Sequence, residues 1–342
     1  MIHPDDKVVK NSRIRNIIQI LLPEIFSGRY IRFIAKKRTI ESRYITELMS
    51  RYFVASLKKT DITKLNQDIH NEIVKNWDMK IFIDNFYYLK DGYQKKRVSQ
   101  IIEASYPIRN NDIVIDIGSW IGTFAFHSAT FSKMSIAVDY SLEVLKKGKD
   151  IISSKFPNLV NKIYFIQADV TALPFKGGMA DIVFSCDCIE HLPKESHYRY
   201  INELLRVMGR KGKALIHSPN LIYFRIKDYI LKLISEEYRE YVRYLKKNPT
   251  MENPLYNISH IGLTEPLSVM RLIRKTGFGG RHRFILNRNN FYVPKISKYA
   301  LTRPLTTIFR YTPFIKWIFC DKWLLVLYGD RNPIRGMTRK QE

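Results

Sequence analysis

The stretch Asp116-Ile-Gly118-Ser-Trp-Ile-Gly122 decides how this chain folds. It overlaps the end of the short apolar run Ile113–Ile117, which predicts a buried strand, and it precedes a predicted helix at Thr123–Phe131. Glycine at such a turn lets the backbone approach a ligand without a Cβ in the way, and the helix N-terminus favours an anionic group. The alternative is a tight strand-to-helix turn that binds no ligand.

Beyond this turn, short strand-like runs alternate with helical stretches, which is the pattern of βαβ units. The further predicted strands are Met134–Asp139, Lys162–Gln167, Asp181–Ser185, Lys213–His217, Phe284–Leu286 and Trp323–Tyr328. The further predicted helices are Leu142–Ser154, Ser196–Met208 and Leu267–Lys275, the last ending at Gly277 as a C-terminal cap would. The fold class is therefore α/β.

Polar motifs also follow the second, third and fourth predicted strands, and ligands bind at the carboxyl ends of parallel strands. Asp139 can accept hydrogen bonds from both hydroxyls of a ribose, or it can cap the next helix. Asp169 can accept from the exocyclic amine of an adenine while Val170 packs on the ring, or it can be a solvated loop residue. The fourth motif is Ser185-Cys-Asp187-Cys-Ile-Glu190-His191-Leu-Pro193.

These four motifs, in this order, resemble those of class I methyltransferases that use S-adenosylmethionine (SAM). The resemblance runs from about Tyr88 to Gly280. The fourth motif is similar to the branch of quinone-biosynthesis O-methyltransferases and general small-molecule methyltransferases, and Ser218-Pro-Asn220 and His260-Ile-Gly-Leu-Thr264 match that branch too. The resemblance implies a Rossmann-like, seven-stranded, mostly parallel sheet whose last strand is antiparallel.

The resemblance also implies a set of residues that contact SAM. Asp139 would meet the ribose, Asp169 and Val170 the adenine, and the other members mainly the methionine. The full predicted set is Asp116, Gly118, Ser119, Gly122, Asp139, Tyr140, Asp169, Val170, Cys186 and Asp187. Trp120 is a departure, because the family usually has glycine there, and its ring could obstruct the pocket or stack near the sulfonium.

Two histidines are the candidates for catalysis. Methyl transfer from a sulfonium needs alignment of the acceptor, and it needs a base only when the acceptor must lose a proton. His191 is the first candidate base and His260 the second, although either can be a packing residue. We favour a site without a metal. The alternative is Mg²⁺ held by Asp187, Glu190, His191 and His260, because some relatives with E-x-x-E-H and a distant histidine bind a divalent ion.

The net charge of +25 is concentrated at the two ends of the chain. Residues 1–60 hold 13 Lys and Arg against 5 Asp and Glu, and residues 281–342 hold 13 against 3. A basic periphery around an ordinary core indicates contact with an anionic membrane surface or a nucleic acid. Large apolar residues accompany the charge in residues 287–320, which favours peripheral membrane association, assisted by residues 12–38.

We therefore expect a helical N-terminal cap at residues 1–85, a methyltransferase core at 86–286, and a basic helical insertion plus the final strand at 287–342. The N-terminal helices can pack on the core or lie at a membrane surface. Only three cysteines occur, the N-terminus lacks an apolar leader, and no long uncharged apolar run exists. These features predict a cytoplasmic protein without a spanning helix.

The sequence leaves the methyl acceptor open. A tyrosine-rich stretch between Asn220 and Thr264 is expected to cover the acceptor site and suits a flat or lipid-like molecule. The first hypothesis is O- or C-methylation of a small-molecule or lipid-like acceptor. RNA methylation is the second, and a SAM-binding interaction protein without catalysis is the third. A nicotinamide-binding domain is disfavoured, because the first turn lacks the G-x-G-x-x-G spacing.

Overall fold

A computed structural model describes residues 83–234, 236–247, 260–286 and 320–329, and also Gln67, Asn71 and Lys80. Most of the predicted N-terminal cap and of the basic insertion lies outside these residues, as does nearly all of the predicted membrane-binding sequence. Contacts divide the chain into two compact units. The larger unit contains residues 56–219, 259–285 and 323–342, and the smaller contains 1–55, 220–258 and 286–322.

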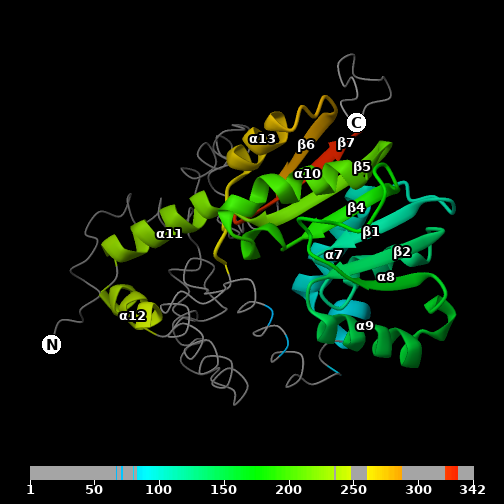
Figure 1. Ribbon diagram of the computed structural model, residues 1–342. Helices are drawn as coiled ribbons and strands as arrows, with labels where there is room; N and C mark the ends of the chain where they lie inside the picture. Colours follow the sequence, from blue (N-terminus) through cyan, green and yellow to red (C-terminus); the bar gives the residue numbers. More distant parts are fainter. Residues whose placement is uncertain are drawn as a thin grey trace, which may run out of the picture. The chain divides into compact units, whose positions relative to one another are not determined.

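A seven-stranded sheet with the order β3-β2-β1-β4-β5-β7-β6 forms the larger unit (Figure 1). Its first five strands pair in parallel. All of the predicted strands are present, and the first two have the predicted bounds, whereas β5 begins at Met208 rather than Lys213. The strands are β1 Ile113–Ile117, β2 Met134–Asp139, β3 Ile163–Gln167, β4 Ala180–Cys186, β5 Met208–Pro219, β6 Arg281–Leu286 and β7 Lys322–Tyr328.

The last strand runs opposite to both of its neighbours, as predicted. The N–H of Gly329, directly after β7, donates to the carbonyl oxygen of Gly212 near the start of β5, at 2.9 Å. A Cβ added to Gly280, directly before β6, would lie 2.2 Å from the carbonyl oxygen of Tyr328, the last residue of β7. The end of β7 therefore lies beside the starts of β5 and β6, and β7 is antiparallel to both.

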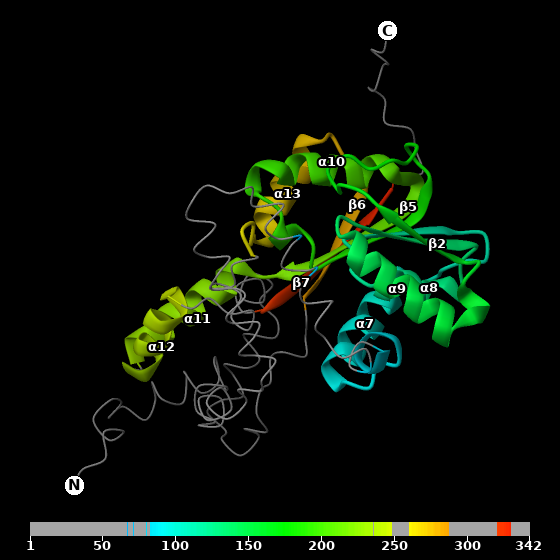
Figure 2. The same ribbon diagram turned by 60° about the horizontal axis from the view of Figure 1, so that its bottom comes forward.

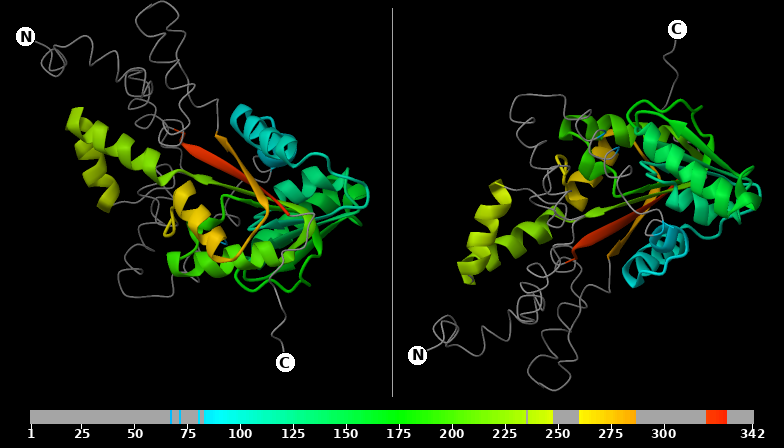
Figure 3. Two further views of the ribbon diagram at one scale, coloured as in Figure 1. Left: turned by 90° about the horizontal axis from the view of Figure 1, so that it is seen from above. Right: turned by 90° about the horizontal axis from the view of Figure 1, so that it is seen from below.

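Helices cover both faces of this sheet (Figures 2 and 3). One face carries α7 (Gly92–Ser105), α8 (Thr123–Ala129) and α9 (Leu142–Lys155). The other face carries α10 (His197–Val207) and α13 (Pro266–Lys275). Because the crossover helices pack on the faces, the carboxyl ends of β1 to β5 remain together at one edge.

Local hydrogen bonding and backbone geometry account for the start of α9 and the end of α13. Ser141 begins α9 by accepting a hydrogen bond at its side-chain oxygen from the N–H of Val144, at 3.2 Å. Gly277 follows α13 with a φ of 75°, the left-handed conformation expected of a C-terminal glycine. On α10, Tyr200 and Leu204 are fully buried one helical turn apart, so this face of the helix packs against the sheet.

Most of the described residues of the smaller unit form a helical hairpin. It consists of α11 (Leu221–Ile234) and α12 (Glu236–Lys247). The hydroxyl of Tyr238 donates to the carboxylate of Asp228 at 3.2 Å, which joins the two helices. Both helices belong to the tyrosine-rich stretch that is predicted to cover the acceptor. Within the described residues, no helix is long and apolar enough to cross a membrane.

Candidate active site

The turn between β1 and α8 is held in a left-handed backbone conformation. Gly118, Trp120 and Gly122 have φ values of 66°, 52° and 83°. A Cβ at Gly118 would lie 2.5 Å from Sγ of Cys188, so both backbone and space require glycine there. Trp120 has no such freedom, and a side chain in this region costs on the order of 1–2 kcal/mol. Its indole packs against the ring of Phe86 and the neighbouring apolar cluster.

Asp116, at the end of β1, is buried beneath this turn. Its Oδ2 accepts hydrogen bonds from the N–H groups of Phe124 and Ala125 at the start of α8, each at 3.1 Å. Burial raises the pKa of Asp116 to about 7, although the two backbone donors oppose the shift. Asp116 therefore caps α8 and can gain or lose a proton near neutral pH.

Asp139 connects the turn after β1 to the turn after β2. Its Oδ2 accepts from the N–H of Trp120 at 2.9 Å, and its Oδ1 accepts from the N–H of Ser141 at 3.0 Å. The N–H of Ser119 donates to the carbonyl oxygen of Val138 at 2.9 Å, which holds the same two turns together. The direction of the Asp139 carboxylate is thus fixed by the backbone.

The predicted adenine-binding residues lie after β3, beside the end of β2. Asp169 is exposed, and its Oδ1 accepts from the N–H and the hydroxyl of Thr171, each at 2.8 Å. Val170 is buried. Tyr140 has an exposed ring, and its carbonyl oxygen accepts from the side chain of Gln167 at 3.0 Å. The structure therefore brings the predicted ribose and adenine residues to adjacent strand ends.

An ion-pair network that the sequence did not predict surrounds Asp187. Its Oδ1 lies 2.8 Å from Nδ1 of His217, and its Oδ2 accepts from the guanidinium of Arg97, whose side chain is 11% exposed. Asp187 itself has a φ of 55°. Arg97 is on α7, a helix that the sequence analysis did not predict, and it belongs to no motif, so no sequence pattern pointed to it. His217 ends a predicted strand, and this position alone is weak evidence for a role in the site.

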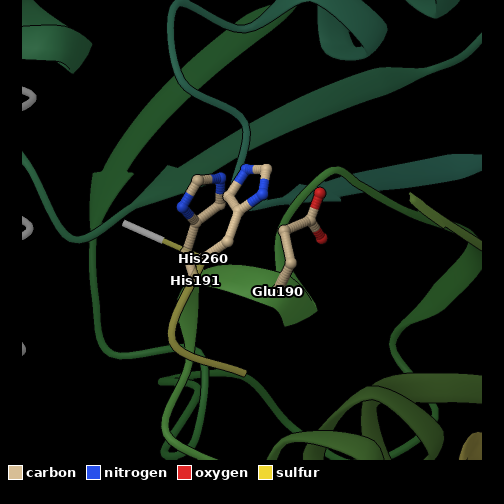
Figure 4. Close-up of side chains that lie close together, drawn as sticks. All are labelled: Glu190, His191 and His260. Atoms are coloured by element: carbon tan, nitrogen blue, oxygen red, sulfur yellow. The ribbon is translucent and has the colours of Figure 1, made fainter. Parts of the chain in front are cut away.

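The fourth motif brings Glu190 and His191 next to His260. Their ligand atoms all lie within 4.8 Å of one another (Figure 4). The rings of His191 and His260 are 5.0 Å apart between centroids, at 74°. The structure thus brings together three of the four candidate ligands of the alternative metal site. It pairs the fourth, Asp187, with Arg97 and His217 instead, because the backbone turns there and the cation of Arg97 attracts the carboxylate.

Close packing of two distant segments creates this group. Glu190 is buried, and its Oε2 accepts from the hydroxyl of Ser218 at 3.0 Å. The N–H of Gly262 donates to the carbonyl oxygen of Glu190 at 2.9 Å. A Cβ at Gly262 would lie 1.9 Å from the carbonyl oxygen of Leu192, so glycine allows the contact that places His260 beside the fourth motif.

The cysteines of the fourth motif are buried free thiols. Cys186 and Cys188 are buried and form no disulfide. Burial raises the pKa of the Cys186 thiol well above its usual range, with the nearby carboxylate of Asp116 acting in the same direction. A buried, protonated thiol is not a nucleophile.

Residues 115–216, which run from within β1 to within β5 and include the turns after β1 to β4, match the model of a methyltransferase domain family. Residues 115–216 therefore form a methyltransferase domain. Tocopherol O-methyltransferase from Arabidopsis thaliana is 30% identical over 104 residues, which are 30% of this chain and 29% of that protein. Norajmaline N-methyltransferase from Rauvolfia serpentina is 29% identical over 113 residues, or 33% and 37% of the two chains.

The methyltransferase domain thus spans less than two fifths of the length of these two curated relatives. Among solved structures, the YcgJ protein from Bacillus subtilis is similar with a TM-score of 0.46 and 16% identity. That match covers 70% of this chain and 100% of the other.

Proposed function

We propose that this chain binds SAM and transfers its methyl group to a small-molecule or lipid-like acceptor. One observation carries the proposal: the motif residues gather at a single edge of the sheet. Asp116 and Asp139 are at the ends of the paired strands β1 and β2, and the histidine group follows β4, which pairs with β1 on its other side. A donor and an acceptor bound at these positions would be neighbours.

Each turn meets one part of SAM in this proposal. The turn after β1 receives the methionine, because its glycines leave room for a close approach. Asp139 accepts from the ribose hydroxyls, and Asp169 and Val170 meet the adenine. The remaining contacts come from the side chains and backbone of Ser119, Tyr140 and Cys186.

Arg97 supplies a cation that the motifs lack. Its Nε donates to the side chain of Gln94 at 3.0 Å, and its guanidinium carbon lies 5.9 Å from the ring centroid of Phe124 on α8. The ion pair with Asp187 holds this guanidinium at the same edge of the sheet. A planar guanidinium suits a carboxylate, and we assign it to the carboxylate of the methionine.

His191 and His260 face the acceptor in this proposal. The sulfonium is already an activated leaving group, so the protein mainly aligns the acceptor and excludes water. For a hydroxyl or phenol acceptor, one imidazole takes the proton as the new bond to the methyl group forms. The carboxylate of Asp187 acts on neither step, because Arg97 and His217 engage it.

A divalent ion is a second candidate, favoured by the convergence of Glu190, His191 and His260. Two imidazoles and one carboxylate suit Mn²⁺, Fe²⁺ or Zn²⁺ better than Mg²⁺, which prefers oxygen ligands. When bound, such an ion supplies Lewis-acid activation of an acceptor oxygen. Transfer that continues unchanged in excess chelator would reject the ion and leave the histidines to act alone.

The proposals of a lipid-like acceptor and of membrane association depend on residues 287–320, which combine basic and large apolar side chains. Co-sedimentation with liposomes tests this part. Binding should require anionic lipid, weaken with added salt, and fall when Phe309 and Trp317 are changed to serine. Salt-sensitive binding to RNA without binding to liposomes would favour RNA methylation instead.

The test of the whole proposal is a transfer assay with radiolabelled SAM and extracts of lipids, quinones and RNA. Label in the lipid or quinone fraction supports the proposal and gives the acceptor class. Label in RNA supports the alternative. Binding of SAM with no label transferred to any fraction would identify a SAM-binding protein without catalysis.

A further inference from the structure

The turn that contains Trp120 is contacted from outside the family motifs by η2, the π-helix Ile83–Tyr87. The hydroxyl of Tyr87 donates to the carbonyl oxygen of Ile121 at 2.5 Å, and Tyr87 is only 3% exposed. The ring of Phe86 lies 5.8 Å from that of Trp120, between centroids, at 50°. Thus η2 contacts Trp120 and also the residue that follows it in the turn.

The helix η2 is in turn fixed on α8 and its surroundings. The carbonyl oxygen of Phe86 lies 3.0 Å from Nε2 of His127. The rings of Tyr87 and Phe126 pack edge to face with their centroids 4.8 Å apart. Farther upstream, Oδ1 of Asn71 accepts from the hydroxyl of Ser141 at 2.6 Å. Residues upstream of Tyr88, where the family resemblance begins, therefore contact both of the turns that Asp139 joins.

Trp120 needs this support more than a glycine would. Its φ of 52° is in the left-handed region, which glycine adopts freely and a tryptophan does not. We infer that Tyr87 and Phe86 are positioning residues for the cofactor, which hold the turn between β1 and α8 in its SAM-binding shape. The inference rests on the proposed SAM site. It makes the SAM affinity of this chain depend on a segment outside the family motifs.

Tyr87→Phe tests the inference, because it removes only the hydroxyl and keeps the packed ring. The affinity for SAM, measured by titration calorimetry, should fall about 3- to 10-fold, the usual net effect of losing one hydrogen bond. Tyr164→Phe on β3 is the matched control. Its hydroxyl also donates to a backbone carbonyl, that of Asn161 at 3.4 Å, and its loss should leave SAM affinity unchanged.

A double-variant cycle separates positioning from general stability. In a Trp120→Gly background the turn can adopt its left-handed backbone without support, so adding Tyr87→Phe should weaken SAM binding by less than about twofold. The melting temperature of each variant is measured in parallel. An equal loss of SAM affinity from Tyr87→Phe in both backgrounds would overturn the inference.

Hydrogen exchange of the unliganded protein gives a readout that does not need SAM. The N–H of Gly122, which donates to the carbonyl oxygen of Ser119 at 2.9 Å, should exchange faster in Tyr87→Phe and not in Tyr164→Phe. If the wild type binds no SAM, the proposed function fails while this exchange still reports on the support of the turn. If the wild type binds SAM and Tyr87→Phe binds it equally well, the inference alone fails.

Discussion

The two halves of the candidate site differ in how their polar groups are held. On the cofactor side, Asp116 accepts hydrogen bonds from backbone N–H groups at the start of α8, and Asp139 accepts from backbone N–H groups of the turns after β1 and β2. On the acceptor side, Glu190 and His191 meet His260 from a distant segment. The cofactor side is therefore held mainly by backbone groups near neighbouring strand ends, whereas the acceptor side depends on the packing of a distant segment. The two halves should accordingly respond to substitution in separable ways.

The largest effect is expected from His191→Ala on the acceptor side. Loss of a base that takes the proton of the acceptor should slow methyl transfer about 100- to 10,000-fold, while SAM affinity stays the same. Radiolabel transfer and titration calorimetry measure the two quantities. His282→Ala, at an exposed histidine on β6, is the matched control and should change neither. If SAM affinity falls together with the rate, the two halves are not separable.

A smaller effect is expected from Asp139→Ala on the cofactor side. Affinity for SAM and for its demethylated product should fall about 5- to 150-fold, which corresponds to roughly 1–3 kcal/mol for unmade charged hydrogen bonds. Calorimetry measures both ligands. Asp150→Ala, at an exposed aspartate on α9, serves as the control. Equal binding by the Asp139 variant would remove the ribose assignment and leave the rest of the cofactor site standing.

The smallest effect is a pH dependence of SAM binding that comes from Asp116. Burial raises its pKa from 3.8 to about 7, so the carboxyl is increasingly protonated as the pH falls below that value. Under the proposed function, Asp116 lies near the methionine of SAM, and its protonated form lacks the negative charge that attracts the positive sulfonium. SAM affinity should therefore fall about 3- to 10-fold between about pH 7.5 and 6 and level off at higher pH.

Asp116→Asn is the control for this dependence, because its amide oxygen can still accept from Phe124 and Ala125. Its SAM affinity should be lower and nearly flat over the same pH range. The raised pKa also means that ionised Asp116 destabilises the unliganded fold as the pH rises from 3.8 through about 7. The variant should therefore raise the melting temperature more above pH 7 than below it, and a steep pH dependence retained in the variant would assign the titration to another group.

The sequence was sufficient for the strands and for the positions of Asp116 and Asp139 at strand ends, because these follow from local patterns, whereas the contacts of the two aspartates with SAM stay a prediction. β1 and β2 are short apolar runs bounded by polar turn residues, so their ends could be placed to the residue. The turns after these two strands contain both Asp139 and the backbone N–H groups of Trp120 and Ser141 that donate to it. The sequence left the direction of the Trp120 ring open, and the contact with Phe86 decides it.

The sequence was insufficient where distant segments meet. Arg97 and His217 are 90 and 30 positions away from Asp187, and nothing in the intervening spacing indicates that they pair with it. The proximity of His260 to the fourth motif was suggested by family resemblance alone, and its physical cause, the close approach at Gly262, is visible only in the fold. That the tyrosine-rich stretch between Asn220 and Thr264 covers the acceptor stays a prediction. The helices α11 and α12 make up much of this stretch.

The binding of SAM to the purified wild-type chain tests the central claim most directly. Titration calorimetry should show saturable binding of one SAM per chain, and binding of the demethylated product at the same site. Asp139→Ala should weaken both, since its carboxylate joins the turns after β1 and β2. If the folded wild-type protein shows no binding of SAM even at millimolar concentration, the proposed cofactor site is wrong.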